Sequence, residues 1–551
     1  MHKRIVNDVI YLTGEVSSYE EKLKLGKQNV KKGFHVVNNI VVKGLKEEKI
    51  RKPNIYDQSL DGLNVDVLII GGGISGCSLL RELTRYNLNV CLIEKESDVA
   101  FAASGRNDGE VHPGVDLKKG SLKQSLVVKS NRIYESVCKE LDVKFKRVGQ
   151  HVIFTKSSYL PVIQYYKHNR VKKCGVDDTK IIKKEQLFKM EPHINKEAKF
   201  SLYNSMAGIV CPYSLCIAYC ENAISNGAKV YLETMCLGLN LQNDSIKEVI
   251  TNKGKIKAKI VVNASGTYAE EIAKMANDQF YSIHPRKGTD LIFDKKAFGE
   301  LNSIVSKKDL KKNKAHSKGG GIILTVDNNI LVGPDAIETP FKEDFSVSKE
   351  SIDNIFNKQK EAYPNLKRSD IITYFSGVRA CTYEEDFVIE WGRNCHNLYH
   401  IAGIQSPGLT TAPLVAKNVS KEIALKLHAS INENFNPIRK GYGHLNELDE
   451  ISRDRLIKQN SDYGIIICRC EEVSKGEIID CLKSPLPIKN IDGIKKRVRA
   501  GMGRCQGGFC SPLVSKIIAD FYNIPVEKVT KNSLESYICL KSNKGGENDG
   551  L

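Results

Sequence analysis

The chain has 551 residues, of which 41% are hydrophobic, and carries a formal net charge of +18. This length exceeds one compact core and predicts two or three domains, while no apolar run reaches the ~18 residues of a membrane-spanning helix. The lysines are scattered through every segment instead of forming blocks with interleaved aromatic residues. This pattern argues against a nucleic-acid partner and favours small anionic substrates or an acidic partner surface.

The first residues, MHKRIVNDVIYLTGEV, lack the apolar core and small-residue cleavage site of a signal peptide. We therefore expect a cytoplasmic protein whose membrane contact, if any, is peripheral to the inner face of the cell membrane or is made through a partner. The 16 cysteines are then expected to be reduced thiols. Most lie in apolar surroundings and are predicted to be buried, and only four have a ligand-like spacing.

Residues 1–45 have the pattern of a small α/β unit. VIYLTGEV predicts a strand, SSYEEKLKLGKQNVKKG a helix that begins after a serine cap, and HVVNNIVVKGL another strand. LTGEV and, more approximately, FHVVNNIVV resemble the strands of a BON domain. The charged, proline-containing residues 46–62 are predicted to be a linker.

The next segment has the pattern of a dinucleotide site. VDVLII predicts a buried parallel strand, and Gly71, Gly73 and Gly76 follow at the turn into a helix. These glycines allow a tight turn, a close approach of the backbone to a pyrophosphate, and close packing of helix on strand. A second strand, NVCLIE, ends at Glu94, whose carboxylate can accept both hydrogen bonds of a ribose diol. The alternative is a glycine-rich turn in an ordinary α/β sheet.

The following loop, ASGRNDGEVHPG, decides between NAD and FAD. It is small, polar and irregular, and resembles the flavin-contacting loop of the D-amino-acid-oxidase superfamily of FAD-dependent oxidoreductases. The resemblance extends over residues 65–425 through four later segments in the family's chain order: NGAKVYLETMCLGL, AKIVVNASGTYAEEIA, GVRACTYEEDFVIE and YHIAGIQSPGLTTAP.

The resemblance implies FAD as the cofactor and a set of residues around it. These are Gly71, Gly73, Ile74, Ser75, Gly76, Glu94, Lys95, Ala103, Ser104, Asn107, Gly109, Glu110, Cys236, Ala264, Ser265, Gly266, Gly403, Ser406, Pro407, Gly408, Leu409 and Thr410.

Four cysteines near the end of the chain predict a metal centre. Cys468 and Cys470 precede, by 34 intervening residues, Cys505 and Cys510 in the glycine-rich stretch GMGRCQGGFC. Four thiolates suit a [2Fe–2S] cluster or a tetrahedral zinc ion. The C-x-C and C-x-x-x-x-C spacings resemble the bacterioferritin-associated-ferredoxin-like [2Fe–2S] domain, with zinc and unligated thiols as the alternatives. Glycines would let backbone N–H groups face the sulfides.

The two halves together resemble the large subunit of anaerobic glycerol-3-phosphate dehydrogenases and their close homologues. The resemblance implies an α/β FAD-binding Rossmann-like domain with an interleaved antiparallel-sheet substrate domain, over residues 63–425. A connector over residues 426–462, a small helical iron–sulfur domain over 463–541 and a tail over 542–551 follow.

Oxidation of an alcohol needs a base for the hydroxyl proton and a cation for an anionic group. His112 matches the family's active-site histidine, and a packing or surface histidine is the alternative. Arg379 is expected to be both catalytic and an anion clamp, because guanidinium binds carboxylate or phosphate in a bidentate way; a structural salt bridge is its alternative. Arg286 and Lys287 are substrate or entrance candidates, or parts of an ordinary surface turn, with Thr289 replacing an acid common in the family.

The resemblance implies a dehydrogenase that oxidises sn-glycerol 3-phosphate and passes electrons through the cluster to partner subunits or a quinone chain. Ala380 follows Arg379 where the family often has proline, so a 2-hydroxy acid such as L-2-hydroxyglutarate is the second candidate substrate, and an amino or imino acid the third. Two other classes remain: an electron-transfer flavo-iron–sulfur protein without its own substrate, and a cluster-based sensor.

Overall fold

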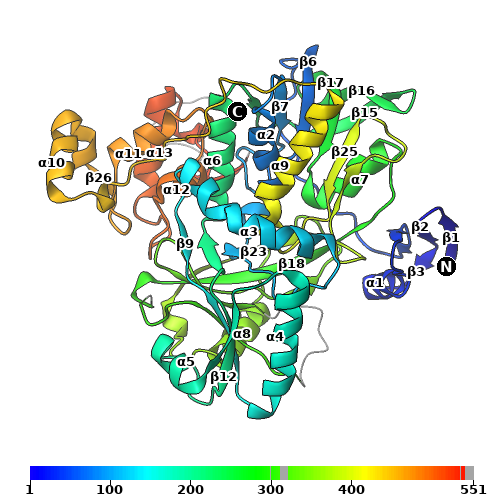
Figure 1. Ribbon diagram of the computed structural model, residues 1–551. Helices are drawn as coiled ribbons and strands as arrows, with labels where there is room; N and C mark the ends of the chain where they lie inside the picture. Colours follow the sequence, from blue (N-terminus) through cyan, green and yellow to red (C-terminus); the bar gives the residue numbers. More distant parts are fainter. Residues whose placement is uncertain (298, 311–319, 534, 540–551) are drawn as a thin grey trace.

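The computed structural model describes residues 1–297, 299–310, 320–533 and 535–539. The N-terminal unit has the predicted strand–helix–strand order (Figure 1). In its sheet β2 (Val9–Thr13) lies between the antiparallel β1 (His2–Val6) and the parallel β4 (His35–Asn38). Helix α1 (Tyr19–Gln28) begins after Ser18, whose side chain accepts the N–H of Glu21. The short strands β3 (Glu15–Val16) and β5 (Val41–Val42) pair beside it.

The domain that contains the glycine-rich turn, called the cofactor-type domain below, is built on an eight-stranded sheet. Its parallel core is made by β14 (Lys229–Tyr231), β7 (Val90–Ile93), β6 (Leu63–Ile70), β17 (Gly254–Asn263) and β25 (Leu398–Ala402). Antiparallel strands complete it: β16 (Ser245–Thr251), β15 (Cys236–Gln242) and β24 (Val388–Trp391). Strand β7 is buried throughout and β6 is buried over its last four residues, which explains the apolar runs VCLI and VLII.

Helices cover both faces of this sheet (Figure 1). On one face, α2 (Ile74–Leu83) packs against α6 (Pro212–Ser225) and α9 (Gly408–Lys426), and α3 (Leu122–Glu140) packs against α9. The short α7 (Ala269–Met275) lies near the other side. A small sheet of β8 (Glu110–Val111), β13 (Gly208–Val210) and β9 (Phe145–Arg147) connects this domain to the second one.

The second domain is a nine-stranded, mainly antiparallel sheet, as the sequence predicts for the substrate domain. Its strands run in the order β11 (Thr179–Lys183), β12 (Phe200–Asn204), β10 (Gln150–Phe154), β19 (Ile304–Lys307), β20 (Gly321–Leu324), β21 (Ile330–Gly333), β18 (Ile283–Phe293) and β22 (Ile337–Glu338), with β23 (Ile371–Thr382) also on β18. Helices α4 (Leu160–Cys174), α5 (Lys184–Met190) and α8 (Lys349–Lys360) surround it (Figure 1).

The C-terminal domain is small and mostly helical, as predicted. A hairpin of β26 (Ile466–Cys468) and β27 (Val473–Ser474) leads to α11 (Lys475–Leu482), α12 (Ile491–Val498) and α13 (Ser511–Tyr522). The connector before it contains α10 (Glu450–Gln459). The domain lies on the opposite side of the molecule from the N-terminal unit (Figure 1).

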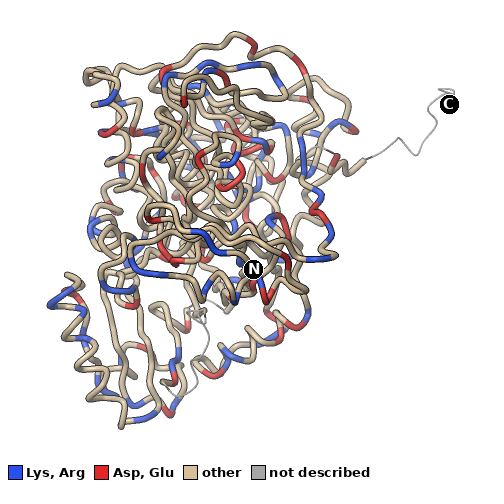
Figure 2. Tube along the Cα trace, turned by 90° about the vertical axis from the view of Figure 1, so that its right-hand side faces the viewer, with Lys and Arg blue, Asp and Glu red and all other residues tan. Residues whose placement is uncertain are grey.

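Basic and acidic residues are interspersed along the trace of the described chain (Figure 2). Among the same residues, no helix is both long and apolar enough to span a membrane.

Candidate functional site

A cavity of about 930 Å³ lies between the two large domains, within the range of cofactor and ligand sites. It is lined by most of the residues that the sequence predicts for FAD and substrate, from several distant segments. Four predicted cofactor residues do not line it: Gly76, Gly109, Gly403 and Thr410.

The glycine turn has the close approaches that its motif predicts. Gly71 has a φ of +115°, and a Cβ there would lie 2.5 Å from the carbonyl oxygen of Ala264. A Cβ on Gly76 would lie 2.0 Å from the carbonyl oxygen of Gly71, so Gly76 serves the packing of α2 against the turn. Gly73 caps α2, which places the helix N-terminus at the cavity.

Glu94 is held at the end of the second strand. Its carboxylate accepts the N–H of Gly72 at 2.6 Å and that of Glu96 at 2.9 Å. Burial, together with the neighbouring charge of Glu96, raises the pKa of Glu94. These bonds orient the carboxylate at the cavity wall.

His112 is oriented by a carboxylate that the sequence predicts for the cofactor. Glu110 Oε1 lies 2.9 Å from His112 Nδ1, and both side chains are nearly buried. The other ring nitrogen, Nε2, lies 3.3 Å from Ser406 Oγ. Thr410 accepts the backbone N–H of His112 at 2.9 Å, which explains the place of Thr410 behind the cavity wall. A Glu-x-His spacing on a short strand is the local signal that could have predicted this pair.

Arg379 lines the cavity and donates to one acceptor only among the described residues, the backbone carbonyl of Asp335, at 3.3 and 3.2 Å. Two buried carboxyl groups lie nearby. Burial raises the pKa of Asp290 and of Asp108, and the nearby charge of Arg379 opposes both shifts. In the described part of the chain the guanidinium has no carboxylate partner at hydrogen-bonding distance, and it keeps N–H donors for an anion.

Arg286 and Lys287, the other two predicted substrate residues, differ from Arg379 in their surroundings. Arg286 pairs with Arg379 in the β18–β23 register and lines the cavity, but its guanidinium is bound by Glu338 and Glu385. Lys287 does not line the cavity and donates to Asp344 at 2.7 Å. The geometry thus favours Arg379 as the anion-binding residue.

The four C-terminal cysteines lie on two facing loops. Cys470 and Cys505 are exposed with their sulfur atoms 3.9 Å apart, whereas Cys468 and Cys510 are buried. A hydrogen bond from Cys510 lowers the pKa of Cys468 to about 6. Within the described residues, no three His, Cys, Asp or Glu side chains converge as on a single metal ion.

Two thiol pairs fit the two irons of a [2Fe–2S] cluster better than the four-ligand shell of one zinc ion. The glycines leave room for the loops to meet: a Cβ on Gly503 would lie 2.3 Å from the Cβ of Cys470. The N–H of Gly501 points to the sulfur of Cys468 at 3.5 Å.

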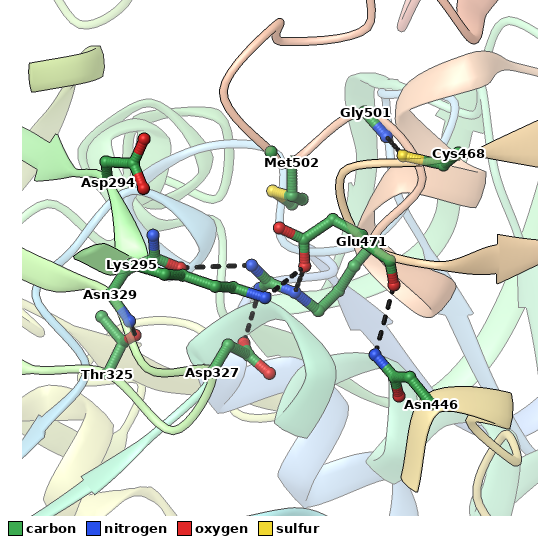
Figure 3. A network of polar contacts seen from close by, with 12 residues as sticks. Asp294, Lys295, Thr325, Asp327, Asn329, Asn446, Cys468, Glu471, Gly501 and Met502 are labelled. Carbon is green, nitrogen blue, oxygen red and sulfur yellow. Dashed lines mark hydrogen bonds and ion pairs between the residues drawn. The ribbon is translucent and has the colours of Figure 1, made fainter. Parts of the chain in front are cut away.

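A polar network joins the cysteine loop to the substrate domain (Figure 3). Glu471, next to Cys470, accepts from Lys295 at 2.9 Å and from Arg499 at 2.8 Å. Arg499 also donates to Asp327 at 2.6 Å. Glu471 is almost fully buried, so the network fixes the loop against the β20–β21 hairpin.

Comparisons with known proteins agree with this geometry. The FAD dependent oxidoreductase family matches residues 66–422. The chain belongs to this family. The BFD-like [2Fe-2S] binding domain matches residues 466–520, so this oxidoreductase carries FAD and [2Fe–2S] modules.

Three relatives are informative. A glycerol 3-phosphate dehydrogenase of Caloramator mitchellensis is 36% identical over 87% of this chain and 99% of its own length. One component of an anaerobic glycerol-3-phosphate dehydrogenase of Haemophilus influenzae is 24% identical over 83% of this chain and 86% of its own. An FAD-bound L-alpha-glycerophosphate oxidase structure from Mycoplasma pneumoniae has a TM-score of 0.63 and 24% identity, covering 68% of this chain and 98% of its own.

Proposed function

We propose that this oxidoreductase oxidises sn-glycerol 3-phosphate to dihydroxyacetone phosphate and delivers the electrons, through its [2Fe–2S] domain, to a partner protein or quinone chain. The observation that carries the proposal is the presence, in one cavity, of an oriented histidine and an arginine that no described carboxylate neutralises by direct contact. The name of the Caloramator relative, which matches nearly end to end, supports the choice of substrate.

Arg379 would bind the phosphate. Its donors on the cavity side can form two parallel charge-assisted hydrogen bonds with two phosphate oxygens, which fixes the orientation as well as the position of the substrate. Asp335 holds the guanidinium through its carbonyl group, not through its carboxylate, so this contact leaves the positive charge in place.

His112 would take the proton of the hydroxyl group. The charge of Glu110 Oε1, 2.9 Å from Nδ1, would keep the ring proton on Nδ1, so that Nε2, 3.3 Å from Ser406 Oγ, would be the basic nitrogen. Glu110 then stabilises the imidazolium that forms. FAD, when bound, accepts the hydride that leaves the carbon as the alcohol becomes a ketone.

Residues around the cavity would hold the cofactor. We assign the glycine turn and the N-terminus of α2 to the pyrophosphate, Glu94 to the ribose, and the 103–110 loop and residues 406–409 to the flavin end. The pairs Cys468/Cys510 and Cys470/Cys505 would each bind one iron. Reduced flavin gives up two electrons and the cluster accepts one at a time, which suits a dehydrogenase with a protein or quinone acceptor. We keep the BON-like nature of residues 1–45 as part of the proposal.

The test is anaerobic reduction of the purified protein by candidate substrates. Glycerol 3-phosphate should bleach the flavin absorbance in a single turnover, whereas L-2-hydroxyglutarate and amino acids should not. Bleaching by a hydroxy acid or an amino acid alone would refute the substrate assignment. Absence of bleaching by every candidate, with normal reduction by dithionite, would favour an electron-transfer protein. An iron and acid-labile sulfide assay tests the cluster independently.

A further inference from the structure

The segment that joins the N-terminal unit to β6 forms part of the cofactor cavity. Ile50 and Arg51 line the cavity beside Glu94, Lys95 and Glu96. Both precede residue 66, where the match to the FAD dependent oxidoreductase family begins. The sequence predicts only a linker here. The structure places this segment at the cavity although it lies outside the part of the chain that matches the family.

The segment is fixed to the body of the protein by its backbone and by Glu48. The carboxylate of Glu48 accepts the N–H groups of Lys342 and Glu343 at 2.7 and 2.6 Å. Further along, Asp57 donates its N–H to the carbonyl oxygen of Asn252 at 3.0 Å. These bonds hold residues 48–57 against the domain at both ends.

The N-terminal unit anchors the other end of the segment. Its helix α1 meets the ring of Tyr383 so closely that a Cβ on Gly26 would lie 2.1 Å from a ring carbon. Asn38 donates its side-chain amide to the Tyr383 hydroxyl and its backbone N–H to Ser282 Oγ, both at 2.9 Å. The unit is therefore docked on the β18–β23 strands, and the segment leaves it towards the cavity.

Arg51 bridges two carboxylates at this end of the cavity. Its guanidinium lies 3.0 Å from Glu96 and 3.1 Å from Glu343, and 4.5 Å from the ring centre of Phe101. The two carboxylates are over 90% buried as side chains, so their charges are poorly screened by water. Lys95 also contacts both of them.

The charge balance here depends on Arg51. Burial raises the pKa of Glu96, while Arg51 and then Lys95 favour its charged form. Glu96 in turn acts on Glu94, the residue positioned for the ribose. Without Arg51, Lys95 would be the one cation left in contact with Glu96 and Glu343 among the described residues, and Lys496 and Arg106 would act on Glu96 from farther away. A cofactor with a pyrophosphate would then meet a negative cavity wall.

We propose that Arg51 is a positioning residue of the FAD site: by neutralising Glu96 and Glu343 it lets Glu94 and the anionic cofactor share one end of the cavity. The N-terminal unit serves to hold Arg51 there. This inference concerns cofactor affinity and does not depend on the identity of the substrate.

The experiment compares FAD affinity of full-length apoproteins by quenching of flavin fluorescence. Arg51→Gln should raise the Kd for FAD about tenfold, equivalent to about 1.4 kcal/mol. The double variant Arg51→Gln/Glu96→Gln should return the Kd to within about threefold of the wild-type value, because the net charge of the cluster is then that of the wild type. Arg132→Gln, which breaks an exposed ion pair with Asp177, is the matched control and should leave the Kd unchanged.

If the contact between Arg51 and Glu96 had only a structural role, the double variant would bind FAD at least as weakly as Arg51→Gln, because removal of both partners cannot restore the contact. An unchanged Kd in Arg51→Gln, or a double variant as weak as the single one, would overturn the proposal. Should Arg51→Gln fail to fold, the single variant Glu96→Gln still decides: it must bind FAD at least as tightly as the wild type, and weaker binding by more than about threefold contradicts the charge argument.

Discussion

Replacement of Arg379 by alanine should remove much of the free energy with which the protein stabilises the transition state, while FAD stays bound. The guanidinium contacts one carbonyl oxygen of the described chain, so two of its remaining donors are available to the phosphate. Each hydrogen bond to a charged group contributes about 1.5–3 kcal/mol. Loss of two such bonds costs about 3–6 kcal/mol, which predicts a fall in kcat/KM of about 10²- to 10⁴-fold.

Arg379→Lys keeps the charge but loses the fork geometry, and should lose about 10- to 100-fold. The measurement is the anaerobic rate of flavin reduction over a range of glycerol 3-phosphate concentrations, with FAD content determined for each variant. Arg132→Ala provides a control for removal of an exposed arginine outside the cavity. A loss of less than tenfold in Arg379→Ala, or loss of FAD from that variant, would show that Arg379 is not the anion clamp.

Three further changes test other parts of the proposed machinery. His112→Asn should slow flavin reduction about 10²- to 10⁴-fold at saturating substrate while FAD remains bound, as stopped-flow absorbance would measure; an unchanged rate would exclude His112 as the base. Cys505→Ser should abolish acid-labile sulfide but retain FAD, whereas retained sulfide would exclude Cys505 as a ligand. Arg497→Met leaves Asp98 buried without its bidentate partner. It should destabilise the docking of α12 by about 3–5 kcal/mol, seen as faster hydrogen exchange there, and Asp98→Asn added to it should recover part of the loss.

The predictable parts of this protein are those in which one short segment determines the geometry. The glycine turn and Glu94 form a strand–turn–helix–strand unit whose bonds are local, so the sequence alone predicts their arrangement. The helix cap at Ser18 follows from the same kind of local bonding. The two cysteine motifs likewise predict two loops, although the pairing of their thiols required the structure.

The remaining parts depend on contacts between segments far apart in the chain. Arg51, Glu96 and Glu343 come from three such segments, and no local pattern relates them. Lys287 resembles a substrate residue in sequence, but its side chain reaches Asp344 instead of the cavity. Adjacent residues in a strand point to opposite faces, so Arg286 and Lys287 could not both face one site.

The attachment of the C-terminal domain bears on the kind of reaction that this oxidoreductase supports. Arg497 binds Asp98 in the cofactor-type domain, Arg499 binds Asp327 in the substrate domain, and the amide of Gly501 contacts Cys468. One short stretch, residues 497–501, therefore touches both large domains and a cluster thiol. These contacts hold the cysteine loop against both large domains, as the proposed transfer of single electrons from reduced flavin to the cluster would need. The same stretch would be unnecessary in an enzyme whose reduced flavin reacts directly with dioxygen.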